Sequence, residues 1–267
     1  MTLFPIGLLV AIIALAAAIY ELKQSAANFY DFVALAVVFG GTFAVALMVL
    51  PWDLRREVFR AFRMLFYKRA TDTRAVVRSA LSIVQNPSAP QIEAGVPELA
   101  TKILNEGAEL IQLGLGKERI DEILQERVFL TGRRRRRVGT AIRNLAKYPP
   151  AFGLMGTVLG LVNLMRGLAS GLTAQQTGLE MAVALVATMY GLLLANLFIN
   201  PAGEMVMKKA TEDEDAAEIA LEAVMLAYDR VSILEAQEVL NSYVDERYRI
   251  DLVGGLMTNE GAEAQAA

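Results

Sequence analysis

The chain has 267 residues, of which 55% are hydrophobic, and its mean hydropathy is +0.39. This composition is too apolar for an ordinary soluble protein and predicts a membrane protein. The chain contains no Cys and no His, which excludes disulfide frameworks, thiol or imidazole nucleophiles, and metal sites built on those ligands. The formal net charge of −3 says less than the distribution of charges along the chain.

Four uncharged segments reach or approach the roughly 20 residues that a helix needs to cross a bilayer core. They lie at residues 3–20, 32–50, 149–165 and 181–199. Three alanines at 16–18 resemble a signal cleavage site, but no Lys or Arg precedes the first apolar run. We therefore expect that run to stay in the protein as a membrane span, and the four spans to form two hairpins.

The charges predict the orientation of these spans. Residues 51–148 hold 19 of the 26 Lys and Arg, so by the positive-inside rule this loop is cytoplasmic, and after four crossings both termini are cytoplasmic too. The tail, 202–267, holds 15 of the 29 acidic residues and 5 basic ones, so we expect the loop and the tail to pack together. The sequence thus predicts an all-α integral membrane protein: hairpin 1–50, cytoplasmic helical domain 51–148, hairpin 149–201 and acidic helical tail 202–267.

The loop itself has a helical pattern. Apolar residues recur at three- and four-residue spacing between residues 98 and 128, which predicts two amphipathic helices separated at Gly114 and Gly116. The Pro-containing stretch 86–97 separates them from an earlier helix. Five consecutive arginines at 133–137 are expected to set topology and contact anionic head groups. No aromatic residues interleave with them, so nucleic-acid binding is not expected.

The last two segments carry small residues on one helical face. In the third segment these are Gly153, Gly156, Thr157 and Gly160, and in the fourth Ala184, Ala187, Thr188, Gly191 and Ala195. Their three- and four-residue spacing places each set along one side of its helix. Because packing drives helix association in lipid, such faces predict close contact with another helix, including a helix of a partner subunit.

Thr157 and Thr188 stand out on these faces. At 1.5 Å per residue they lie roughly 10 Å and 16 Å from the cytoplasmic ends of their segments. Either hydroxyl could simply bond to its own helix backbone, but their similar depth suggests an ion path. Pro150 and Pro201 lie at the cytoplasmic ends of the same segments, where proline suits either a first helical turn or a hinge.

The four segments lack charged residues, with Asp31 and Glu180 at their edges. An ion-driven device needs a titratable group within the membrane. If this chain conducts ions, the carboxylate must come from a partner helix packed on the small-residue faces.

Three stretches resemble the MotA/PomA family of flagellar stator A subunits, within the MotA/TolQ/ExbB superfamily: "GGT" at 40–42, "PAFGLMGTVLGLV" at 150–162 and "MAVALVATMYGLLLANLFINP" at 181–201. The resemblance implies a multi-pass protein of the bacterial inner membrane that assembles as a ring, expected to be a pentamer, around MotB-like single-span chains. Each partner would carry the membrane Asp, and flow of H⁺ or Na⁺ would turn a FliG-like rotor. By position, Thr157 and Thr188 match the family's channel threonines, and Pro150 and Pro201 its functional prolines.

The loop departs from the family pattern at the rotor contact, where "IEAGVPEL" lacks the usual basic residue. Candidate rotor contacts are Arg74, Arg78, Glu93 and Glu98. The alternatives are an ExbB/TolQ-type energiser, a stator of a non-flagellar motor, and a plain membrane scaffold or small-solute carrier. An enzyme is not expected, because the sequence shows no nucleophile with a base, no phosphate loop and no metal cluster. No cofactor is expected beyond the transported ion, and the choice between H⁺ and Na⁺ stays open.

Overall fold

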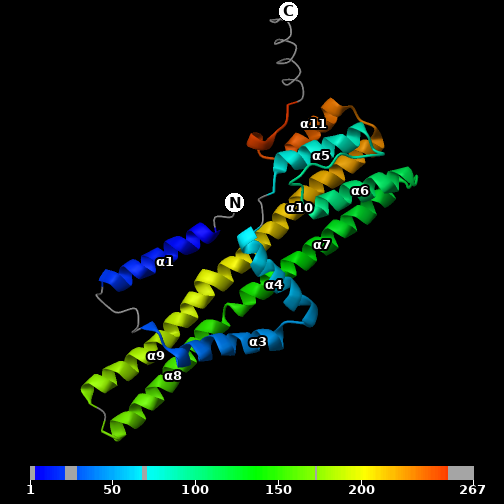
Figure 1. Ribbon diagram of the computed structural model, residues 1–267. Helices are drawn as coiled ribbons and strands as arrows, with labels where there is room; N and C mark the ends of the chain where they lie inside the picture. The colour runs from blue at the N-terminus through cyan, green and yellow to red at the C-terminus, as the bar shows by residue number, and fades with distance from the viewer. Residues whose placement is uncertain (1–3, 22–28, 68–70, 172, 252–267) are drawn as a thin grey trace, which may run out of the picture. The chain divides into compact units, whose positions relative to one another are not determined.

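The computed structural model describes residues 4–21, 29–67, 71–171 and 173–251. Within these ranges the regular structure is helical, as the sequence predicted, and contains no strand. Contacts divide the chain into two compact units, one within residues 1–68 and 136–207, the other within 69–135 and 208–267. Two long helices, α7 (Lys117–Leu145) and α10 (Asn200–Asp229), contribute residues to both units (Figure 1).

The first unit contains the apolar helices and the amphipathic helix α4. In chain order they are α1 (Phe4–Glu21), α2 (Phe32–Leu35), the π-helix η2 (Ala36–Gly40), α3 (Gly41–Val49), α4 (Trp52–Tyr67), α8 (Tyr148–Ala169), α9 (Ala174–Leu193) and the π-helix η3 (Leu194–Ile199). The carboxylate of Asp31 caps α2 by accepting from the Ala34 N–H. Leu50 is extended, the conformation favoured before a proline, so the second span ends there and α4 begins as a separate helix.

Among the residues that the structure describes, three helical runs are long and apolar enough to cross a membrane. They lie at Phe32–Val49, within Lys117–Ala169 and within Gln175–Asp229, and a shorter apolar helix covers Ile6–Glu21. These lengths and compositions agree with the membrane protein that the composition predicted.

The helices α8 and α9 extend beyond the uncharged segments predicted at 149–165 and 181–199. The expected link of 15 residues shrinks because α8 continues to Ala169 and α9 begins at Ala174. Thr173 and Gln176 form a capping box that starts α9, and Gly171 has a φ of +90° in the turn before it. The predicted segments ended at charged residues. In the structure the charged residues do not end these two helices: α8 ends before the left-handed turn at Gly171, and α9 begins at the capping box.

The second unit combines residues 69–135 of the long loop with the tail. It contains α5 (Thr73–Gln85), α6 (Glu98–Gln112), α11 (Ile233–Ser242) and the adjoining parts of α7 and α10. The break at 86–97 and the separation of α6 from α7 were both predicted. Gly114, between α6 and α7, has a φ of +74°, a conformation that side chains other than glycine rarely adopt.

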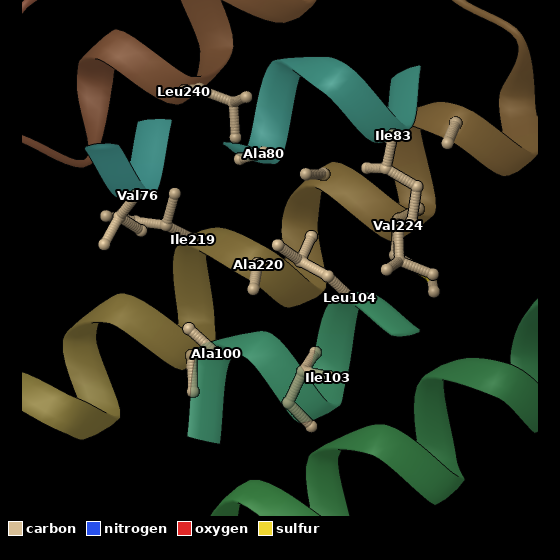
Figure 2. Close-up of a cluster of buried hydrophobic side chains, with 14 of the residues drawn as sticks. Val76, Ala80, Ile83, Ala100, Ile103, Leu104, Ile219, Ala220, Val224 and Leu240 are labelled. Carbon is tan, nitrogen blue, oxygen red and sulfur yellow. The ribbon is translucent and has the colours of Figure 1, made fainter. Parts of the chain in front are cut away.

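An apolar core joins loop and tail inside this unit. Figure 2 shows Ile83 of α5 and Leu104 of α6 facing Ala220 and Val224 of α10, with Leu240 of α11 nearby, and all five are buried. Ion pairs between loop and tail join Lys117 to Asp229 and Arg135 to Asp213. The predicted packing of the loop on the tail is confirmed, although buried apolar area, more than charge, holds the two together.

Candidate functional site

The helices α8 and α9 pack on each other through small residues. A Cβ atom on Gly160 would lie 2.6 Å from the Ala184 Cβ, and one on Gly153 would lie 2.9 Å from the Ala187 backbone oxygen. Real Cβ atoms do not approach other atoms this closely, so larger residues would force the helices apart. Two further close approaches are Gly156 on the Ala187 side chain and Gly191 on the Pro149 backbone. The two small-residue faces therefore meet each other within one chain.

The close packing brings four oxygen atoms together. Thr157 Oγ1 lies 2.5 Å from Thr188 Oγ1 and 3.1 Å from the backbone oxygens of both Gly153 and Ala184. Thr188 Oγ1 also lies 3.4 Å from the Gly153 oxygen. Both threonines are half-buried. We call these four atoms the oxygen cluster: the side-chain oxygens of Thr157 and Thr188 and the backbone oxygens of Gly153 and Ala184.

The hydrogen-bonding capacity of the oxygen cluster is not used up by its internal contacts. Each threonine hydroxyl has one proton to donate and two lone pairs to accept with. If one hydroxyl donates to the other, the second can donate to a backbone oxygen, and lone pairs remain. These can hold a water or contribute to the coordination of a monovalent cation. The four oxygens carry no formal charge, so a cation there needs a counter-charge from another group.

The fourth span ends in a second cluster of buried side chains. Ala195, predicted on the small-residue face, lies in η3 and packs in an apolar cluster with Leu50, Ile142 and Ile199. Asn200 donates its N–H to the Ala195 oxygen, which is the five-residue spacing of a π-helix.

Pro150 and Pro201 lie in different local settings. Pro150 is half-buried in the first turn of α8, where a missing N–H removes no helical hydrogen bond. Pro201 follows η3 inside a helical run that passes from α9 into α10. A proline ring clashes with the carbonyl four residues before it in a regular α-helix. The wider π-turn immediately before Pro201 relieves that clash.

The second span and the segment before it contact the α8–α9 hairpin. A Cβ on Gly41, in the GGT motif, would lie 2.4 Å from the Phe152 ring of α8. The Tyr190 hydroxyl of α9 donates to the Phe29 backbone oxygen and lies 3.4 Å from the Asp31 N–H, which donates to it. Helix contact thus explains the second glycine of the GGT motif. Tyr190 is a packing residue that sequence reasoning had not singled out.

The four predicted rotor-contact residues lie exposed in the second unit. Arg78 and Glu93 form two hydrogen bonds of 2.7 Å, which lower the pKa of the Glu93 carboxyl and raise the pKa of the Arg78 guanidinium. Arg74 donates to a backbone oxygen of the tail at 2.6 Å. Glu98 pairs with Lys102 at 2.7 Å on the same helix. The structure brings Arg78 and Glu93 together. Arg74 lies one helical turn before Arg78 on α5, and Glu98 is the first residue of α6.

A polar contact between α8 and α9 was missed by sequence reasoning. Asn163 Nδ2 donates to Glu180 Oε2 at 2.9 Å. Glu180 had been placed at the edge of the fourth segment, whereas the helix begins six residues earlier, at Ala174. The signal was present, because Asn163 follows Gly160 by three residues and Glu180 precedes Ala184 by four, so each extends a small-residue face.

Comparisons with known proteins agree with this arrangement. The model of the MotA/TolQ/ExbB proton channel family matches residues 95–219, a range that includes α8, α9 and the oxygen cluster. Motility protein A from Treponema pallidum (strain Nichols) is 23% identical over 236 residues, which cover 86% of this chain and 89% of that protein.

Two solved structures share the fold. The structure of C. jejuni MotAB has a TM-score of 0.81 and 13% sequence identity over 94% of this chain and 100% of that chain. The flagellar MotAB stator complex from Bacillus subtilis has a TM-score of 0.77 and 18% identity over 93% of this chain and 98% of that chain. With the sequence motifs, these comparisons show that the chain is similar to motility protein A and that its middle part matches the MotA/TolQ/ExbB proton channel family.

Proposed function

We propose that this chain is the A subunit of an ion-driven stator, which with a MotB-like partner conducts H⁺ or Na⁺ and converts the ion flux into torque for flagellar rotation. The match of residues 95–219 to the model of a proton channel family supports this proposal, as do relatives named motility protein A and a similar chain in a flagellar stator complex. This role is transport and mechanical work, with no covalent chemistry on a substrate.

The proposed topology has four spans in the bacterial inner membrane with both termini in the cytoplasm. The concentration of Lys and Arg in residues 51–148 supports this orientation. The first span is α1, whose apolar helix is shorter than the other three candidates. The long loop and the tail then form a cytoplasmic unit, in agreement with the core that they share.

The oxygen cluster is the single observation that carries the proposed ion path. Its two hydroxyls lie within 2.5 Å of each other, although the threonines are 31 residues apart and on different helices. Hydroxyl and carbonyl oxygens can replace part of the hydration shell of Na⁺, or hold a water that relays a proton. The cluster is neutral, so we propose that the carboxylate of a MotB-like membrane helix supplies the counter-charge beside it.

The proposed assembly follows from this arrangement, in which this chain supplies the oxygen cluster and the partner supplies the carboxylate. Several copies of the chain would surround the partner helices as a ring, which we propose to be a pentamer, so that each copy offers one oxygen cluster in turn. Pro150 and Pro201 would act as hinges that transmit the ion's passage to the cytoplasmic unit. There, exposed charges such as Arg74 and Glu98 would contact a FliG-like rotor protein.

Replacing the threonines by valine tests the ion path, because valine keeps the branched shape and removes the oxygen. In cells that express both subunits, Thr188→Val and Thr157→Val should each lower ion conductance and torque by roughly 5- to 30-fold, since one polar contact in lipid is worth on the order of 1–2 kcal/mol. Co-purification of the partner should be unchanged. The measurements are rotation speed of tethered cells and ion flux into the same cells.

A matched control is available on α9. Thr177 donates to the Thr173 backbone oxygen at 3.0 Å, within its own helix, so Thr177→Val should leave flux and torque intact. Normal flux and torque in the Thr157→Val, Thr188→Val double variant would reduce both threonines to packing residues and overturn the proposed ion path.

A further inference from the structure

The contact between Asn163 and Glu180 lies on the same helix faces as the oxygen cluster. Residues opposite each other in the antiparallel hairpin include Gly153 with Thr188 and Gly160 with Ala184. The Asn163–Glu180 hydrogen bond of 2.9 Å continues this series toward the α8–α9 link. At 1.5 Å per residue, Glu180 lies about 12 Å from Thr188 along α9.

The charge at this position is unusual for the hairpin. Between residues 148 and 199 the sequence contains two charged residues, Glu180 and Arg166. Glu180 is half-buried and sits about 9 Å from the first residue of α9. Arg166 lies about one turn beyond Asn163, in the last turn of α8. The cost of a carboxylate in a membrane helix rises with its depth in the bilayer, so a carboxylate inside the span needs a partner or a function.

The geometry suits a carboxylate that is held in place and still able to bind. The Asn163 amide donates to Glu180 Oε2, which orients the carboxylate, and an ionised carboxylate accepts at both oxygens through about four lone-pair sites. Capacity therefore remains for a cation or a hydronium ion. The helix-packing explanation, in which this bond only fastens the hairpin, needs the hydrogen bond but not the negative charge. That difference separates the two explanations.

We propose that Glu180, positioned by Asn163, is the cation-capture site at the outer end of the hairpin, which concentrates H⁺ or Na⁺ and delivers it to the oxygen cluster. This inference rests on the proposed ion path and adds a second site to it. Negative charge at the mouth of a low-dielectric path raises the local cation concentration, by about tenfold or more. Loss of the charge should therefore weaken ion capture and leave the later steps unchanged.

The test is the dependence of flux and rotation speed on external ion concentration in cells that express this chain with its partner subunit. External Na⁺ is varied at fixed pH, and external pH is varied at fixed Na⁺. Glu180→Gln keeps the size and an amide oxygen that can accept from Asn163, but removes the charge. It should raise the half-saturating ion concentration about tenfold while the maximal speed stays near the original. Glu238→Gln, which removes an exposed charge from α11, should change neither.

Two further variants keep the test decisive. Glu180→Asp retains a carboxylate and should stay within about threefold of the original half-saturating concentration. Asn163→Ala keeps the charge of Glu180 but removes the hydrogen bond that positions its carboxylate. It should raise the half-saturating ion concentration about threefold. If Glu180→Gln fails to assemble with the partner subunit, Asn163→Ala still tests the capture site. An unchanged half-saturating concentration in the assembled variants would overturn the capture site. If the original complex shows no partner-dependent flux, or the threonine double variant behaves normally, the proposed ion path itself fails, which is a separate result.

Discussion

At the scale of single residues, the hairpin depends on positions where a side chain is absent. Because Gly153 and Gly160 have no Cβ atom, the α8 backbone can approach α9 at these two positions. A Cβ atom there would overlap with atoms of α9. This approach is what places the Thr157 hydroxyl within hydrogen-bonding distance of a backbone oxygen on the other helix. Small residues and the oxygen cluster are thus one feature, because the second requires the spacing that the first allows.

Gly160→Leu should separate the two helices. The added side chain would start 2.6 Å from the Ala184 Cβ, and overpacking of this kind typically costs about 1–3 kcal/mol. We expect a lower melting temperature of the detergent-solubilised protein, followed by circular dichroism, and reduced flux because the oxygen cluster opens. Gly178→Leu is the matched control, since a Cβ on Gly178 meets no atom within 4 Å. Equal melting temperatures for the two variants would contradict the proposed role of the glycine face.

This prediction modifies the expectation from sequence. The small-residue faces were expected to receive another helix, including one from a partner subunit. In the structure the contact of Gly160 is with Ala184 of the same chain, so its substitution acts first on the hairpin. Contact between these faces and a partner helix stays a prediction.

At the scale of elements, two of the apolar helical runs contain a π-turn. One, η2 (Ala36–Gly40), precedes the glycine that packs on Phe152, and the other, η3 (Leu194–Ile199), precedes Pro201. A π-turn inserts one residue into a helix and changes the direction of the side chains that follow it. In the run from α9 to α10, it changes the helix between the oxygen cluster and the residues of α10 that follow Pro201.

Pro201→Ala should restore the backbone N–H and remove the ring, so that the π-turn can relax to a regular α-turn. We expect ion flux to persist while torque per ion falls, because the oxygens of the cluster remain and the hinge changes. The measurement is rotation speed and ion flux in the same cells. Pro150→Ala should have a smaller effect, since Pro150 lies in a first turn where the ring replaces no hydrogen bond. Equal loss of flux and torque in Pro201→Ala would argue against a hinge.

At the scale of the whole molecule, the chain builds two units from interleaved segments. The loop and the tail meet in one apolar core, although residues 136–207, which belong to the first unit, separate the two parts in sequence. Alanines on α10, among them Ala216, Ala220 and Ala223, are buried in that core. A glycine allows close packing on the same helix, because a Cβ on Gly107 of α6 would lie 2.3 Å from the Val224 side chain of α10.

Cysteine labelling tests the proposed orientation of this chain, which has no native Cys. Ser88→Cys lies at an exposed position of the loop and should react with an impermeant maleimide after the cells are opened, but not before. Ser170→Cys, exposed in the link between α8 and α9, should react in intact cells. The opposite pattern at Ser88 would show that the four-span topology is wrong.

The sequence by itself determined the class of the protein and most of its elements. Apolar length predicted the spans, three- and four-residue periodicity predicted α6 and α7, and Gly114 marked the break between them. These are local properties, since hydropathy, helical period and the backbone freedom of glycine depend on a few neighbouring residues. The motifs around Thr157 and Thr188 indicated the family for the same reason.

Only the tertiary structure decided which side chains meet. The 2.5 Å contact of Thr157 with Thr188, the bond between Asn163 and Glu180 and the pairing of Arg78 with Glu93 join residues 15 to 31 positions apart. Such contacts depend on how each helix is rotated and how closely its backbone approaches the next. A face of small residues can pack on the other helix of its own hairpin or on a partner helix. Close packing in lipid depends on the shape of the two faces, so the sequence of one face does not identify the helix that it contacts.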